Sequence, residues 1–464
     1  MSRYQQMTEE LDALLCIGTS FDVQRRKLCV AGSFEASFYS VAGLLDDRVS
    51  ERLLAFAVSA PTPEQALFNL PYHDVSFSSD PTFLAESLLT GRGVLAVDGI
   101  DCAAVIDAKS YPLRSVEEPE NDRVLRGPRD GFSESLVRNT SLIRRRLRDP
   151  KLRLKKISVG SPALCDVALC YVEGMADAAF VAKIEKKLRS IKIQALNMSQ
   201  ESLAECLIHR GWYNPFPKIR YTERPDAAAA MLEEGSVILV CDNTPQVMIL
   251  PTSIFDFLQE TDDFYFPPLV GTYLRLTRMA IFLLALVLTP VWYLLIKTPE
   301  NLPERLRFLL IEAPAAIPLL MQLLLAEFMI DGLKLASLNT PSMLGNSLSV
   351  VGGLILGDYA VTAGWFSPQT ILYMAVVAIA SFTQQSYELG YAFKFLRILL
   401  LIAVEFFGIW GLLGGFVLAA VAIASNKTVS GSRSYLYPLI PFNGKALWRL
   451  LVRPRLKRRE GGDK

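Results

Sequence analysis

The uncharged run at residues 279–296 places the strongest limit on the fold of this chain, because residues 1–278 are of mixed polar and apolar character. The hydrocarbon core of a bilayer is about 30 Å thick, and a helix of roughly 20 apolar residues spans it. We therefore expect this run to be the first of several membrane-spanning helices. The predicted fold is an α/β cytosolic head of two similar subdomains, followed by an all-α polytopic membrane module.

The overall composition conceals this division, because the two parts of the chain average out. Charged residues make up 20% of the 464 residues and the net charge is +1, as in many soluble proteins, whereas 51% of the residues are hydrophobic. Residues 1–30 contain several charges and no long apolar run. We therefore expect no signal peptide and a head that stays in the cytosol.

Two stretches of the head resemble each other, residues 38–46 and residues 169–177. In each, an apolar run ends at a glycine, Gly43 or Gly174, and an aspartate follows three residues later. This pattern predicts a strand, a turn and a helix with the aspartate as its N-cap. The repeat indicates two α/β subdomains of similar plan.

A second pair of stretches, residues 91–106 and 235–249, supports the repeat, because each predicts a β-hairpin. We expect five segments along the chain. They are a first head subdomain at 1–120, a basic helical connector at 121–157, a second head subdomain at 158–265, a transmembrane module at 266–430 and a basic cytosolic tail at 431–464.

The connector carries nine Lys or Arg residues and one acid between positions 138 and 156. Such a basic stretch is typical either of a nucleic-acid-binding surface or of a helix that faces acidic neighbours or anionic lipid. Because the net charge of the chain is close to zero and apolar segments follow, we expect no nucleic acid as partner. The residues expected to contact lipid or another subunit are Arg144, Arg145, Arg146 and Arg148.

Further apolar stretches at 308–330, 335–357, 359–387 and 398–425 predict four or five membrane crossings in all. The tail from position 445 has eight basic and two acidic residues, which predicts a cytosolic C-terminus by the positive-inside rule. A cytosolic head and tail require an even number of crossings. The 308–330 stretch is the candidate for a re-entrant segment, because it contains two prolines and two glutamates.

The 335–357 stretch is rich in glycine and serine, and Gly353 and Gly357 form a GxxxG element. One interpretation is close packing of two helices. The other is a helix that lines a narrow water path in an oligomer. The residues expected to line the pore or pack the helices are Gly345, Ser349, Val350, Gly352, Gly353, Gly357 and Asp358.

Other charges also fall within the predicted membrane module. Glu327 and Glu405 are expected to be buried acids that face a polar partner or an ion, although Glu327 has Asp331 and Lys334 nearby on the same helical side as local partners. Residues 387–397 predict an amphipathic helix on the membrane surface, with its two bases at the cytosolic interface.

Residues typical of catalysis are scarce. The chain contains only two histidines, and it has no HExxH, phosphate-loop or dinucleotide-binding motif. Its seven cysteines form no CxxC pair, so we interpret them as reduced core residues. We expect no enzymatic activity, no cofactor and no metal site.

Distinctive motifs lie at 127–132, 142–147, 212–217, 221–226, 366–368 and 387–390. Together they resemble the GerA family of bacterial spore germination proteins, over residues from about 21 to 442. The one departure is Gln385, where the family leads us to expect proline. The motif residues Tyr221, Thr222, Glu223, Arg224, Pro225 and Asp226 have two interpretations, a ligand-binding loop or a structural turn. We favour the structural one, with Asp226 capping a helix at 227–232 and with Glu223 and Arg224 paired locally.

The resemblance implies a multi-pass protein of the spore inner membrane, with its head and C-terminal tail in the cytosol of the spore core. It also implies homo-oligomers, other germination membrane subunits as partners and a role in releasing monovalent cations. The hypothesis is an oligomeric ion-release channel subunit. The alternatives are a non-conducting scaffold or signal-relay subunit of a germinant receptor complex, and a secondary transporter.

Overall fold

The structure, a computed structural model, describes residues 2–111, 127–208, 214–260, 262–311, 315–339, 359–384, 386–429 and 435–453. The chain divides into two compact units. The head unit consists of Met1–Arg210, Lys218–Thr252 and Val429–Gly431, and the helical unit consists of Gly211–Pro217, Ser253–Thr428 and Ser432–Lys464. The predicted segment boundaries at 120, 157, 265 and 430 stay predictions.

The first half of the head unit is a five-stranded antiparallel sheet with strand order β1-β2-β4-β5-β3. Helices cover both faces of this sheet, so its central strand β4 is buried along its whole length. The elements are α1 (Arg3–Leu15), β1 (Val23–Val30), β2 (Phe34–Val41), α2 (Asp47–Ser59), α3 (Pro63–Phe68), β3 (Val75–Ser78), α4 (Pro81–Leu89), β4 (Gly93–Val97) and β5 (Ala103–Ile106).

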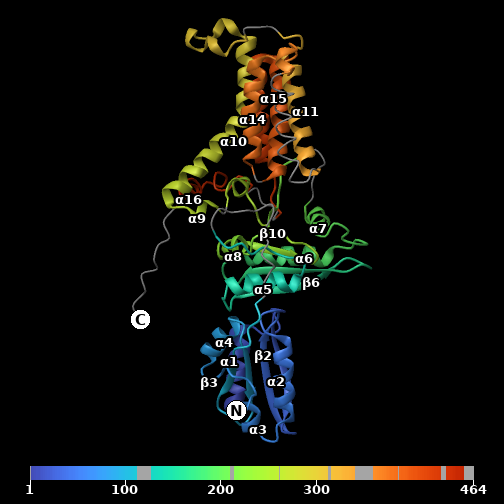
Figure 1. The fold of residues 1–464 in the computed structure, drawn as a ribbon, viewed down its shortest axis with the longest axis vertical. Coiled ribbons are helices and arrows are strands. Elements are labelled where there is room, and N and C mark those ends of the chain that lie inside the picture. Colours follow the sequence, from blue (N-terminus) through green and yellow to red (C-terminus); the bar gives the residue numbers. More distant parts are fainter. Residues whose placement is uncertain are drawn as a thin grey trace. The chain divides into compact units, whose positions relative to one another are not determined.

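The second half repeats the plan, with the antiparallel strand order β6-β7-β9-β10-β8. Helix α5 leads into this sheet, and Figure 1 shows it against the sheet as a blue-green helix. The elements are α5 (Leu136–Arg146), β6 (Leu152–Val159), β7 (Cys165–Val172), α6 (Ala178–Ser190), α7 (Gln200–Leu207), β8 (Arg220–Thr222), α8 (Pro225–Glu233), β9 (Val237–Cys241) and β10 (Val247–Leu250).

The predicted repeat is confirmed at the level of topology, because the two strand orders correspond position by position. Gly43 and Gly174 lie in the turns that follow the matching strands β2 and β7, with φ of 75° and 85°, values that glycine adopts without strain. Asp46 then caps α2 by accepting from the backbone N–H groups of Arg48 and Val49. Asp177 caps α6 by accepting from the backbone N–H of Ala179.

Neighbouring residues of each strand point into different cores. Phe38 packs with α2 and α3, whereas Tyr39 packs with α1 and α4 on the other face. In the second sheet, Cys170 lies in a core with α5 and α8, and burial raises the pKa of its thiol. The cysteines differ from the prediction in part, because Cys29 and Cys206 are exposed.

The helical unit is a bundle of long helices, and Figure 1 shows α10, α11, α14 and α15 running along one another. Two helices of the described chain, α10 and α15, have the length and apolar composition needed to cross a membrane. The predicted four or five crossings therefore stay a prediction. The elements are η1 (Ile254–Leu258), α9 (Asp262–Tyr265), α10 (Pro268–Lys297), η2 (Pro299–Asn301), η3 (Glu304–Leu309), α11 (Leu319–Asn339), α13 (Ala360–Thr362), α14 (Pro368–Phe382), α15 (Tyr387–Ala424) and α16 (Gly444–Leu451).

Helices α11 and α14 run parallel. At their N-terminal ends, the backbone N–H of Ser367 donates to the side chain of Gln322 at 2.9 Å. At their other ends, the ammonium of Lys334 lies 5.3 Å from the ring centre of Phe382. The predicted apolar stretch at 308–330 is not one continuous element, because it contains the end of η3 and the first half of α11.

Helix α15 reverses direction at Gly408, which has φ 56° and ψ −131°. Residues on both sides of it meet, since a Cβ added to Gly415 would lie 2.5 Å from Leu400 Cδ2 and 3.9 Å from Leu400 Cα. The predicted single stretch at 398–425 is therefore a hairpin of two antiparallel helical segments. At 1.5 Å per residue they measure about 31 Å and about 24 Å.

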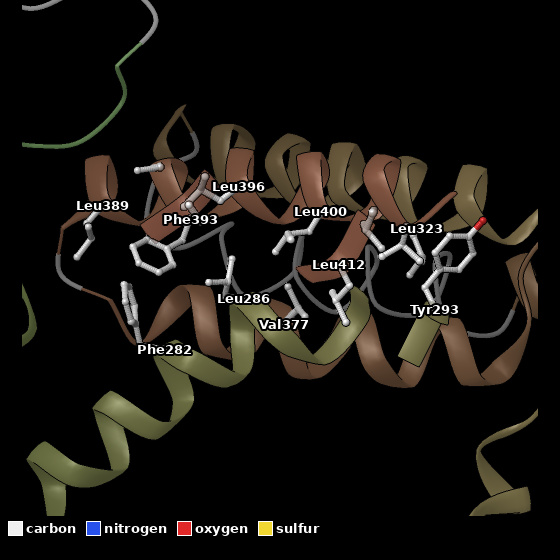
Figure 2. Close-up of a cluster of buried hydrophobic side chains, with 14 of the residues drawn as sticks. Phe282, Leu286, Tyr293, Leu323, Val377, Leu389, Phe393, Leu396, Leu400 and Leu412 are labelled. Atoms are coloured by element: carbon white, nitrogen blue, oxygen red, sulfur yellow. The ribbon is translucent and has the colours of Figure 1, made fainter. Parts of the chain in front are cut away.

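The hairpin packs on the other helices through a continuous apolar core, part of which is drawn in Figure 2. Phe282 of α10 and Phe393 of α15 have ring centres 4.0 Å apart. Leu400 and Leu412, on opposite arms of the hairpin, both contribute to this core.

Candidate functional site

Charged side chains gather inside the helical unit, where apolar residues surround them. Helix α11 supplies Glu327 and Asp331, one turn apart on the same side of the helix. Helix α15 supplies Lys394 and Arg397, three residues apart and therefore also neighbours on one face. We call these four residues the charge cluster.

Arg397 is held by two partners on two different helices. Its Nε donates to Glu327 Oε1 at 2.6 Å, and its Nη1 donates to the backbone carbonyl of Ala285 in α10 at 2.7 Å. The exposed fraction of Arg397 is 4% and that of Glu327 is 2%. The ion pair therefore ties α10, α11 and α15 together away from solvent.

Lys394 extends the cluster toward the C-terminal end of α11. Its ammonium donates to the backbone carbonyl of Glu327 at 3.0 Å, lies 3.6 Å from Glu327 Oε2 and forms an ion pair with Asp331. Lys334 follows one turn later, with its ammonium 5.9 Å from the ring centre of Tyr391. A cavity of about 20 Å³ borders these side chains, which is room for about one water molecule.

Such a cluster is costly to bury, so its arrangement constrains the bundle. A single charge near the middle of a bilayer costs roughly 2.5–3.5 kcal/mol or more unless a partner or water compensates it. Here each carboxylate meets a cation and each cation meets a second oxygen. Since three helices supply these atoms, any change in their packing breaks charge-assisted hydrogen bonds.

The prediction of Lys394 and Arg397 as surface bases at the cytosolic interface was wrong. Both side chains are buried, and their helix continues directly into the apolar part of α15. The sequence shows the two bases three residues apart on a segment whose other residues, apart from Glu388, are uncharged. Their pairing with Glu327, 67 and 70 residues away, depends on the tertiary packing.

The two predicted membrane acids occupy different environments. Glu327 lies within the charge cluster, whereas Glu405 is half-buried near the reversal of α15. The ammonium of Lys297 donates to Glu405 Oε2 at 2.7 Å, and Tyr293 also donates to this carboxylate. Gly345, Ser349, Val350, Gly352, Gly353, Gly357 and Asp358 lie outside the described residues.

In the head unit, Arg144 is buried, with an exposed fraction of 1%. This burial contradicts the prediction that Arg144 contacts lipid or another subunit. Its Nε donates to Asp22 Oδ2 at 2.8 Å, and its other nitrogens donate to the backbone carbonyls of Asp149 and Leu152. Asp22 belongs to the first half of the head and Arg144 to the second. The side chain therefore fastens the two halves together.

The other three connector arginines keep more contact with solvent. Arg145 lies over the ring of Tyr111 at 4.4 Å, and Arg146 pairs with Asp130. Arg148 is exposed. Contact of these three side chains with lipid or another subunit stays a prediction.

The motif at 221–226 packs against the motif at 127–132. Arg224 is fully buried, its Nη2 donates to the backbone carbonyl of Pro128 at 3.1 Å, and the N–H of Phe132 donates to the carbonyl of Glu223 at 2.8 Å. One detail differs from the prediction, because helix α8 begins at Pro225 with Arg224, and not Asp226, in the N-cap position. Arg224 pairs locally, with Asp226 at 2.8 Å.

Comparison with known proteins gives the family of the chain. The family model described as "Bacillus/Clostridium GerA spore germination protein" matches residues 11–461. "Stage V sporulation protein AF" of Bacillus subtilis is 38% identical over 94% of this chain and 90% of the relative. "Uncharacterized membrane protein YfkQ" of the same organism is 32% identical over 84% of this chain and 76% of the relative.

Among solved structures, the N-terminal domain of the A subunit of the Bacillus megaterium spore germinant receptor GerK3 is similar to this chain at a TM-score of 0.38. The sequence identity is 25%, and the match covers 53% of this chain and 91% of that domain. The family model spans both the duplicated head and the helical unit with its charge cluster. The chain belongs to the GerA family of spore germination proteins.

Proposed function

We propose that this chain is a multi-pass subunit of the spore inner membrane that helps to release monovalent cations during germination. The head and the C-terminal tail face the spore core, and several copies assemble with other germination membrane subunits around an ion path. The role is not enzymatic. The observation that carries this proposal is the charge cluster, a set of paired ionic groups inside an apolar helical bundle.

The surface of the helical unit supports a membrane location, because large apolar side chains are exposed on all of its long helices. Water would disfavour such a surface, whereas lipid tails cover it without cost. One relative is itself named a membrane protein. The exposed side chains include Leu283, Met321, Phe328, Leu372, Ile379, Phe406, Phe407, Trp410, Val417 and Val421.

The charge cluster supports an ion-linked role. Ionic groups within membrane segments are rare, and they mark ion pathways or the groups that gate them. Glu327 and Asp331 present carboxylates to a small cavity, and Lys394 and Arg397 neutralise them. We propose that these pairs hold the bundle in a closed state and rearrange when germination begins.

The pore-lining role of the glycine-rich segment belongs to the same proposal. Because α11 and α14 run parallel, Asn339 and Ala360 lie at opposite ends of the bundle. In the proposal, the glycine-rich segment between them lines the ion path, as its small residues predict. Gly353 and Val350 then face the ion path of the oligomer.

The test measures potassium release from germinating spores of a host in which this chain replaces its own relative. Gly353→Leu narrows the proposed path, so we expect release to slow by about tenfold, whereas Val350→Ala widens it and makes dormant spores leak. Gly414→Ala is the matched control, because a methyl group there meets open space. Unchanged release with Gly353→Leu at normal protein abundance contradicts the pore assignment.

Reconstitution separates the proposal from its alternatives. A conducting subunit carries potassium across liposome membranes without a coupled substrate. A scaffold or signal-relay subunit shows no flux, and a secondary transporter shows flux that saturates with a co-transported solute. Flux that Gly353→Leu reduces and that no solute gradient drives supports the channel.

A further inference from the structure

The first turns of α10 continue beyond its uncharged run, and Figure 1 shows them leading to α9 and α16. Helix α16 is short and amphipathic. Lys445 and Arg449 lie one turn apart on one side, and Leu447, Leu450 and Leu451 lie on the other. Leu450 is buried, whereas Trp448 has an exposed fraction of 63%.

Arg275 of α10 fastens α16 in place. Its Nη1 donates to the backbone carbonyls of Arg449 and Leu450 at 3.1 and 3.5 Å, which are acceptors left open at the C-terminal end of a helix. The backbone N–H of Arg453 donates to Thr272 Oγ1 at 3.1 Å. Helix α16 therefore lies at the level of residues 272–275 of α10.

This level matches the headgroup layer of a bilayer. The uncharged run of α10 begins at Met279, so residues 272–275 lie about 6–10 Å further along the helix axis at 1.5 Å per residue. The polar layer on each side of the hydrocarbon core is about 5–8 Å thick. A helix held at that level with its axis in the membrane plane meets phosphate groups and the outermost acyl carbons.

The charge of the junction is positive on its exposed side. Asp263 and Glu260 neutralise Arg275 and Arg278 beneath the surface. Lys445 and Arg449 are exposed. Among the described residues, Arg275 Nη2 and Arg453 Nη1 are buried nitrogens without a hydrogen-bond acceptor, although each carries N–H groups that require one.

Apolar side chains surround these bases. On α10, the exposed fraction of Leu269 is 82%, and Tyr273 and Leu276 are also exposed. The segment before α16 exposes Ile440 and Phe442. Bases next to exposed aromatic and aliphatic groups are typical of helices that lie in the membrane interface.

We propose that α16, with Arg453 and the first turns of α10, forms a docking surface for anionic lipid headgroups. This inference rests on the membrane location in the proposed function and adds a lipid preference to it. Trp448 and Phe442 enter the outer acyl layer, and Lys445 and Arg449 lie beside lipid phosphates. Arg275 stays beneath this surface and holds α16 in place.

The test uses the full chain in nanodiscs of phosphatidylcholine with a minority of phosphatidylglycerol, and bromine is attached to the acyl chains of one lipid or the other. Bromine quenches tryptophan fluorescence on contact. The difference between the unchanged chain and Trp448→Phe isolates Trp448. We expect brominated phosphatidylglycerol to quench Trp448 roughly fivefold more strongly per molecule than brominated phosphatidylcholine, because basic residues attract anionic headgroups.

Two double variants show whether the preference comes from α16. In K445Q/R449Q, the two brominated lipids should quench Trp448 equally, because the variant no longer attracts anionic headgroups. R26Q/K27Q removes the same charge from exposed positions of β1 and should keep the preference. Equal quenching of Trp448 by both lipids in the unchanged chain overturns the proposal. Absence of quenching by either lipid also overturns it, because Trp448 then faces water or a second protein copy.

Trp410 separates this inference from the proposed function. It has an exposed fraction of 77% and lies beside the reversal at Gly408, far along the chain from α16. Trp410→Phe isolates its fluorescence in the same nanodiscs. Quenching of Trp410 without a lipid preference at Trp448 refutes the docking surface alone, whereas a Trp410 that no lipid quenches refutes the membrane location and the docking surface with it.

Discussion

The two units of this chain each bury an arginine against a carboxylate, and they do so in different ways. Arg144 of the head donates to Asp22 and to two backbone carbonyls, so its hydrogen bonds involve one carboxylate only. Arg397 of the helical unit shares Glu327 with Lys394, which also pairs with Asp331. The first pair joins two sheets, and the second belongs to a series of charges along α11.

This difference follows from what surrounds each pair. A buried ion pair contributes little net stability, because the loss of hydration offsets the attraction, but removal of one partner leaves a charge without compensation. Both arginines donate to peptide carbonyls, but in the head Asp22 is paired with Arg144, and that pair can serve as a fixed fastening. In the bundle, two cations share two carboxylates, so a small shift of one helix can exchange partners. We infer that the first pair is structural and the second is able to switch.

The largest expected effect comes from Arg144→Ala, which leaves Asp22 buried without its cation. We expect a loss of about 3–5 kcal/mol in the stability of the head. Urea-dependent hydrogen exchange of β1 and β2 in the full chain measures it. Arg148→Ala is the matched control on an exposed arginine nearby and should change stability by less than about 0.5 kcal/mol. Equal losses of stability in Arg144→Ala and Arg148→Ala would show that Arg144 does not hold the two halves of the head together.

The next effect concerns the charge cluster. Glu327→Leu leaves Arg397 without its carboxylate, and we expect a loss of roughly 2.5–3.5 kcal/mol. Thermal unfolding of the detergent-extracted chain and its abundance in membranes report this loss.

The double variant E327L/R397L removes both partners of the same pair. It should recover most of the stability, since neither charge remains uncompensated. If the pair is able to switch, the recovered protein still releases potassium abnormally. Normal potassium release from the double variant would assign the pair a structural role like that of Arg144.

A smaller effect is expected at the reversal of α15. Gly408→Ala forces a side chain onto φ 56° and ψ −131°, which costs about 1–3 kcal/mol. Gly414→Ala lies in the same hairpin, meets open space and should stabilise its helix by up to about 1 kcal/mol. Thermal unfolding of the helical signal compares the two variants. If both variants unfold at the same temperature, α15 does not reverse at Gly408.

The smallest expected effect separates the two copies of the repeated head pattern. Gly43→Ala and Gly174→Ala both place alanine at positive φ, which costs about 1–2 kcal/mol. At Gly43 the new methyl group also meets Ser141 Oγ, which donates to the backbone carbonyl of Ala42 at 3.0 Å, whereas open space surrounds Gly174. We expect Gly43→Ala to cost about 1 kcal/mol more, by urea unfolding. No difference would mean that Ser141 moves freely aside.

Much of the head could be predicted because its information is local. Each strand-glycine-aspartate pattern specifies a strand, a turn and a capped helix within ten residues. The pattern occurs at 38–46 and again at 169–177, and the two sheets that contain these copies have the same topology. The exact start of α8 was missed, because proline at the first helical position outweighed an aspartate cap at Asp226.

The candidate site was less predictable, because its contacts join residues far apart in the sequence. Glu327 stood out as an acid in an apolar stretch, but its partners, Lys394 and Arg397, lie on another helix. In the sequence, the segment that contains these two bases looks like a surface helix. Arg144 likewise resembled the other connector arginines. Periodicity does not show which member of a basic run turns inward to Asp22.

By itself, the sequence determined the duplicated α/β head, the apolar segments and the GerA family, since strand patterns, caps and uncharged runs depend on residues close together in the chain. Only the tertiary structure decided that α15 folds back at Gly408, that Arg144 fastens the two sheets and that the bases of α15 turn inward to α11. The physical reason is that a buried charge takes its partner from whichever helix packs beside it, and that packing is a property of the whole bundle.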